Sequence, residues 1–97
     1  MLAMELIPAI RDRLAQVDGR SGGPLASGFR AALWRAQHQA ARAEHTVDDL
    51  RGYCLEALQG WRVLDERDEN DYLRGYRQGF QAVLSDIRRA ETSRFRY

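Results

Sequence analysis

Apolar residues recur at steps of three and four along most of this sequence, and the strongest such run lies near its end. The run contains Leu73, Tyr76, Phe80, Val83, Ile87 and Ala90. Residues at this spacing share one face of an α-helix, whereas a half-buried strand would alternate at every second residue. The run predicts an amphipathic helix over residues 69–91, whose apolar face must be buried against other helices.

Three further runs of the same kind predict helices over residues 4–17, 25–44 and 47–64. The first two are separated by Asp18–Pro24, where three glycines and a proline cannot sustain a helix. Thr46 is placed to cap the free N–H groups of the third helix, and two aspartates follow in its first turn.

The connections between these helices indicate an all-α, four-helix domain that spans residues 1–97. Only the short, polar segment Asp65–Asp71 separates the third helix from the fourth, which predicts an antiparallel helical hairpin. The first two helices would cover this hairpin, and no segment has the pattern of a strand.

Composition excludes several classes of protein. Hydrophobic residues make up 44% and charged residues 30% of the 97 residues, which argues against disorder. The single cysteine cannot form an internal disulfide, and no apolar run is long enough for a transmembrane helix. The N-terminal residues lack the pattern of a secretory signal, so the cytoplasm is the expected location. All 15 basic residues are arginine, which favours a GC-rich bacterial or phage genome.

Glycines inside the predicted fourth helix suggest a place of close approach. Gly75 and Gly79 are four residues apart and therefore stack on one face, beside Tyr76. They allow either close packing within the monomer or a flat strip for a partner helix or second subunit. The second interpretation gives a candidate partner-binding site and includes a homodimer; its residues are Arg74, Gly75, Tyr76, Arg77 and Gly79.

Nucleic acid is the alternative partner, although the net charge of only +1 does not favour it. The arginines that would contact a phosphate backbone lie on the second helix and in the C-terminal tail: Arg30, Arg35, Arg42, Arg94 and Arg96. A helix-turn-helix built on the second and third helices is disfavoured, because Asp48 and Asp49 would face the phosphates.

Neither a metal nor a cofactor site is expected. His38 and His45 lack an evident third ligand, and Arg42 between them would repel a cation. The acidic segment Asp65–Asp71 does not match a calcium-binding loop. Cys54 falls on the apolar seam of the third helix, which indicates a buried group and not a nucleophile. No catalytic set can be assembled, so we expect a non-enzymatic protein.

The C-terminal pattern Tyr72–Phe80, which continues into Val83, Leu84 and Ile87, resembles the closing helix of small helical accessory proteins of phages and mobile elements. The resemblance covers about a fifth of the sequence and identifies no specific family. It implies a protein that acts by binding and blocking a host protein.

Overall fold

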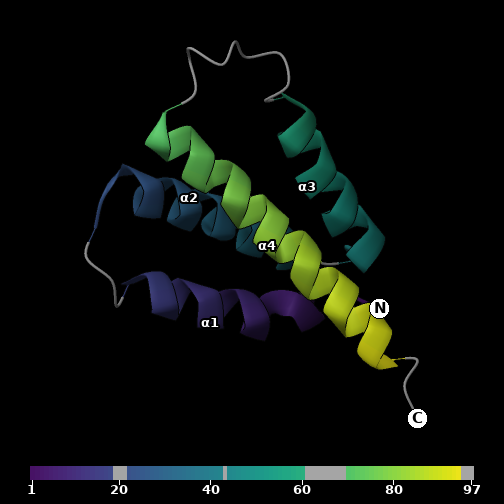
Figure 1. The fold of residues 1–97 in the computed structure, drawn as a ribbon. Helices are drawn as coiled ribbons and strands as arrows, with labels where there is room; N and C mark the ends of the chain where they lie inside the picture. Colours follow the sequence, from purple (N-terminus) through teal and green to yellow (C-terminus); the bar gives the residue numbers. More distant parts are fainter. Residues whose placement is uncertain (19–21, 43, 61–69, 95–97) are drawn as a thin grey trace.

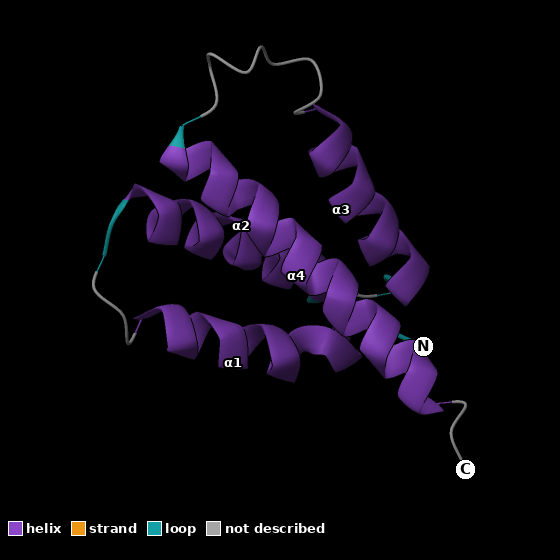
Figure 2. Ribbon diagram, in the orientation of Figure 1, coloured by secondary structure: helices purple, strands orange, loops and turns teal. Residues whose placement is uncertain are grey.

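The computed structural model describes residues 1–18, 22–42, 44–60 and 70–94. These residues form a short 3₁₀ turn, η1 (Ala3–Leu6), and four α-helices, which are α1 (Ile7–Asp18), α2 (Pro24–Ala40), α3 (Val47–Gly60) and α4 (Asp71–Arg94). The predicted all-α class is therefore confirmed (Figure 2). Residues 61–64, which the sequence assigned to the third helix, lie outside the described residues.

The sequence allows the first helix to begin near Met4 or, because of Pro8, at Ile7 after a short lead. The α-helical part begins at Ile7, which places Pro8 in the first turn where its missing N–H is tolerated. The second helix ends at Ala40, not at Glu44. Glu44 has a φ of 71° and lies in the connection between α2 and α3.

Helix α4 lies at the centre of the arrangement (Figure 1). It crosses α2, with α1 and α3 on opposite sides of it in this view. The most extensive contact between helices is α2 with α4, and the contact of α3 with α4 is much smaller. Among the described residues, the main partner of α4 is therefore α2, one of the two helices expected to cover the α3–α4 hairpin.

Glycines on both helices explain why α2 and α4 approach so closely. A Cβ atom added to Gly28 on α2 would strike the carbonyl oxygen of Tyr72 on α4. Conversely, a Cβ atom added to Gly75 on α4 would strike the carbonyl oxygen of Leu25 on α2. Only glycine leaves room for one backbone to lie directly on the other.

Helices α3 and α4 each begin with a side-chain cap. The Asp49 N–H donates to the Thr46 hydroxyl at 3.2 Å, and the Thr46 N–H donates to the Asp49 carboxylate at 2.9 Å. This reciprocal pair is a capping box with aspartate in place of glutamate, and it confirms the predicted role of Thr46. At α4, the Leu73 N–H donates to the Asn70 side chain at 2.9 Å.

The first residues pair with the connection between α2 and α3. The Ala3 N–H donates to the His45 carbonyl at 2.9 Å, and the Val47 N–H donates to the Met1 carbonyl at 3.0 Å. An isolated antiparallel bridge joins Leu2 to Thr46. Among the described residues, no β-strand longer than this bridge occurs. Backbone hydrogen bonds therefore fix the start of α3 against η1.

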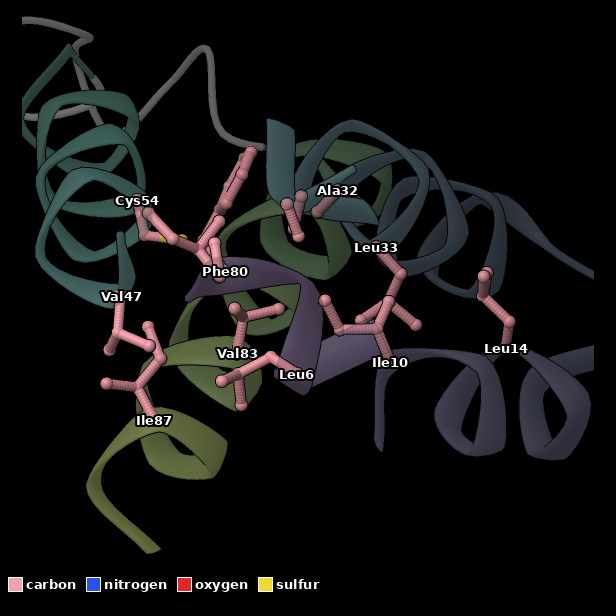
Figure 3. Close-up of a cluster of buried hydrophobic side chains, with 14 of the residues drawn as sticks. Leu6, Ile10, Leu14, Ala32, Leu33, Val47, Cys54, Phe80, Val83 and Ile87 are labelled. Atoms are coloured by element: carbon pink, nitrogen blue, oxygen red, sulfur yellow. The ribbon is translucent and has the colours of Figure 1, made fainter. Parts of the chain in front are cut away.

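Buried side chains from every element form one hydrophobic cluster (Figure 3). Val47 and Cys54 of α3 lie near Phe80 and Ile87 of α4 in this view. On the other side of the cluster, Leu33 of α2 meets residues of α1. The buried members on these two sides include Ile10, Leu14, Ala32, Leu33, Ala36, Leu50, Cys54, Phe80, Val83 and Ile87.

Two sets of ion pairs connect α4 to its neighbours. Arg13 of α1 donates two hydrogen bonds of 2.7 Å to the carboxylate of Asp86, which is only 6% exposed. Arg51 of α3 pairs with Asp48 on its own helix and with Glu91 on α4. The bidentate Arg13–Asp86 pair satisfies both oxygens of a buried carboxylate, as burial of a charge requires.

Across the described residues, no helix combines the length and the apolar content that crossing a membrane requires.

Candidate protein-interaction surface

Aromatic side chains form a row that leads from the core to the surface. Phe80 is fully buried, and Tyr53 of α3 meets it with ring centroids 5.9 Å apart. Tyr76 packs edge-on against Phe80 at 4.9 Å, and Tyr72 stacks on Tyr76 at 6.4 Å. Tyr72, at the outer end, is 41% exposed. The row thus presents a large aromatic surface that is supported from beneath by the core.

Arg35 of α2 lies over this row. Its guanidinium carbon is 5.6 Å from the centroid of the Tyr76 ring, within the range of a cation–π interaction, and its side chain is exposed. We call Arg35, Tyr72 and Tyr76 the tyrosine–arginine surface. It combines two residue types that are enriched among the energetically dominant positions of protein interfaces.

The hydroxyl of Tyr76 stays protonated in this setting. Burial raises the pKa of Tyr76 above its ordinary value, and this effect outweighs the nearby Arg35, which acts to lower it. The phenol is therefore a neutral group near pH 7, and the positive charge of the surface comes from the arginine.

The structure separates the five residues of the predicted partner-binding strip. Gly75 and Gly79 are buried against α2, where a Cβ atom on Gly79 would overlap the Cβ atom of Ala32. Their role is the close packing within the monomer that the sequence offered as the first interpretation. They are not available to a partner, and this corrects the strip.

The other three residues of the strip have different surroundings. Tyr76 is half-buried and belongs to the tyrosine–arginine surface. Arg74 is exposed and lies about 200° from Tyr72 around the helix, because each residue advances by about 100°. Arg77 is partly buried. Arg74 therefore projects away from the side of α4 that carries Tyr72.

The arginines proposed for nucleic acid do not form one continuous surface on α2. Arg30 is partly buried, Arg35 lies over Tyr76, and Arg42 is exposed beyond the end of the helix. Arg30 and Arg35 are five residues apart, which turns them about 140° from each other. Arg94 ends α4, and Arg96 lies outside the described residues.

The groups weighed for catalysis or metal binding are placed as follows. Cys54 is completely buried, and burial raises the pKa of its thiol to about 12. A thiol in this state is not a nucleophile at neutral pH.

His38 is exposed and His45 is partly buried. No three His, Cys, Asp or Glu side chains come together to hold a metal within the part of the chain that the structure describes. Of the acidic segment 65–71, only Asn70 and Asp71 are described.

Sequence reasoning missed the Arg13–Asp86 pair, although a signal for it was present. Asp86 lies at the edge of the apolar arc of α4, about 60° from Val83 around the helix and on the side of Gly79, where a carboxylate comes close to the buried face. A buried carboxylate needs a cationic or hydrogen-bonding partner. The position of Asp86 could therefore have indicated an arginine on a facing helix.

Two large apolar side chains of α2 are exposed. Trp34 is 56% exposed. Leu25, in the first turn of α2, is 42% exposed. Of the two, Trp34 lies opposite the face of α2 that carries Ala32 and Ala36.

Comparison of the chain with protein-family models, with curated proteins and with solved structures finds no match.

Proposed function

We propose that this protein is a non-enzymatic interaction module, which acts as an accessory inhibitor or regulator by binding another protein. The observation that carries the proposal is the tyrosine–arginine surface. Its outer ring, Tyr72, is 41% exposed and stacks on Tyr76, which packs on the buried Phe80. The binding residues are therefore held in place before a partner arrives.

This pre-organisation supports tight binding in physical terms. Ordering a mobile side chain at an interface costs about 0.5–1.5 kcal/mol, and a ring that is already stacked avoids most of that cost. Arg35 adds directed hydrogen bonds to a partner's carboxylates or carbonyl oxygens. The expected mode of binding is burial of Tyr72 in an apolar pocket of the partner, with Arg35 setting the orientation.

The test is a capture experiment from nuclease-treated lysate of the source organism. Wild-type protein and the variants Tyr72→Ala and Arg35→Glu serve as baits, and retained proteins are quantified by mass spectrometry. We expect one protein that is retained stoichiometrically by the wild type and is reduced at least about tenfold by each variant, as loss of a dominant interface residue predicts.

Two matched controls make the result specific. Met4→Ala removes an apolar side chain of similar exposure (46%) from η1, and Arg88→Glu reverses an exposed charge on α4. Both controls should retain the partner as the wild type does. A protein that is captured equally by all variants would overturn the proposed surface. Recovery of nucleic acid alone from a parallel lysate without nuclease treatment would favour the alternative partner.

A further inference from the structure

The outer face of α2 carries an exposed aromatic ring and no acidic residue. No Asp or Glu occurs between Pro24 and Arg42, whereas this segment contains three arginines. Trp34 on the outer face is the most exposed of the large hydrophobic residues described, at 56%. One turn further on, His38, Gln39, Ala41 and Arg42 line a shallow hollow. This face therefore suits an anionic surface that also offers an apolar contact.

The outer face of α3 has the complementary properties. Its exposed residues include Asp48, Leu55 and Glu56, and Leu55 is 46% exposed. Arg51 is the sole basic residue between Val47 and Gly60, and its guanidinium is paired with Asp48 and with Glu91 of α4. Helix α3 therefore presents an apolar side chain among carboxylates.

Gly52 on α3 has no internal explanation. Gly28, Gly75 and Gly79 are each required by the close approach of α2 and α4, but a Cβ atom on Gly52 would meet no atom within 4 Å. A glycine in the middle of a helix costs about 0.5–1 kcal/mol relative to alanine. Gly52 and Leu55 are three residues apart and therefore share one face of α3.

From these observations we infer that the protein associates with itself, through the outer face of α2 on one copy and the outer face of α3 on the next. Trp34 of one copy lies over Gly52 and Leu55 of the other. Arg42 then adds its charge to a face that carries Asp48 and Glu56. The two faces are complementary in charge, which favours their pairing. Each face also contributes an exposed apolar side chain, so the contact can bury apolar surface from both copies.

The dimensions of the two helices set the expected strength. Helix α3 has 14 residues and is therefore about 21 Å long. A single helix pair of this length buries less area than the roughly 1,600 Å² of a standard stable interface, so the association is weak and salt-dependent. Because two different faces meet, each copy retains one unoccupied face, and the average mass increases with concentration.

The experiment is sedimentation equilibrium of the purified protein from about 10 µM to about 1 mM, the range of weak association. Measurements at about 0.02 M salt, where the Debye length is about 20 Å, are compared with measurements at about 0.5 M. We expect the average mass to rise with concentration at low salt and to rise much less at high salt. A monomer at every concentration in low salt would overturn the inference.

Charge exchange then tests which faces meet. Arg42→Glu and Glu56→Arg should each weaken association at least about tenfold at low salt, because each places like charges on the two faces. An equimolar mixture of the two variants should recover association. The unaltered α2 face of the Glu56→Arg copy can meet the unaltered α3 face of the Arg42→Glu copy, and the two altered faces are also opposite in charge. Failure of the mixture to recover would contradict the pairing of these faces.

Two further variants complete the design. Trp34→Ala should abolish the rise in mass, and its circular dichroism spectrum establishes that it is folded. Arg88→Glu changes the net charge by the same amount as Arg42→Glu, but lies on α4, and should associate like the wild type. Equal weakening by Arg88→Glu would show a general charge effect and would overturn the assignment to α2. These measurements use purified protein alone, so their outcome is separate from that of the lysate capture.

Discussion

Helix α4 is held in different ways by α2 and by α3. Against α2, backbone lies on backbone, and Gly28, Gly75 and Gly79 leave no space for a side chain. Against α3, the contact is made by side chains, namely the Tyr53–Phe80 ring pair and the Arg51–Glu91 ion pair. Rings and long charged chains can adjust their rotamers, whereas two backbones cannot move without separating the helices. We therefore expect α4 to tolerate substitutions much better on the α3 side.

The largest effect should follow from Gly75→Ala. The added methyl group would occupy the position of the Leu25 carbonyl oxygen, so α2 and α4 must separate along their most extensive contact. We expect the free energy of unfolding to fall by about 3 kcal/mol, the upper range for overpacking. Urea denaturation followed by circular dichroism measures this change. A loss below about 1 kcal/mol would mean that the α2–α4 contact is as adaptable as the α3 side.

A smaller effect is expected from pH, through the buried Cys54 on the α3 side. Burial raises the pKa of this thiol from 9.0 to about 12 in the folded state. The unfolded chain therefore loses the proton first, so the stabilisation is complete below pH 9 and is lost as the pH rises toward 12. When the pH is raised from 8 to 10, ionisation of this thiol in the unfolded chain should lower the free energy of unfolding by about 1.4 kcal/mol.

The control for this pH effect is Cys54→Ala, measured by urea denaturation at the same two pH values. The variant is less stable at pH 8 but should lose about 1.4 kcal/mol less than the wild type on going to pH 10. If the free energy of unfolding changed equally with pH in the two proteins, the thiol would be accessible to water. The packing of α3 on α4 would then be looser than the burial of Cys54 indicates.

Gly52→Ala should act in the opposite direction to Gly75→Ala. Its Cβ atom would meet no atom within 4 Å, and alanine favours a helix interior. We expect the melting temperature to rise by a few degrees, which corresponds to about 0.7 kcal/mol. The measurement is made at low protein concentration, where self-association does not contribute. If Gly52→Ala lowered the melting temperature instead, the free space around Gly52 would not distinguish it from the tightly packed Gly75.

The smallest effect should come from Arg51→Ala, which removes the ion pairs with Asp48 and Glu91. These groups are partly exposed, so we expect a loss of about 0.5 kcal/mol, which decreases further at high salt. Thermal denaturation at low and high salt measures both values. A loss above about 2 kcal/mol would show that the ion pairs, and not the rings, hold α3 on α4.

Local features of the fold were predictable from the sequence because they depend on nearby residues. The apolar steps of α4 placed Phe80, Val83 and Ile87 in the core, and Thr46 marked the start of α3. The pairing of α2 with α4 was not predictable, because it requires glycines on two separate helices to meet. Gly28 lies near the start of its helix, where a glycine does not by itself indicate a contact, and Gly75 was compatible with either an internal or an external partner.

The candidate site was predicted only in part. Tyr76 and Arg35 were both named from the sequence, but in two competing proposals, and the structure brings them within 5.6 Å. Periodicity gives the direction of a side chain around its own helix and carries no information on which helix lies opposite. The exposure of Tyr72 depends on where α2 begins relative to α4, which is a property of the assembled helices.

The central position of α4 has a consequence for synthesis on the ribosome. This helix follows the other three in the chain, yet it supplies the main contact of α2 and the carboxylate that binds Arg13, 73 residues earlier. Until residues 71–94 emerge, the apolar faces of α1, α2 and α3 have no common partner. The other three helices therefore lack their main packing partner during this interval, and the fold can be completed only after α4 has been synthesised.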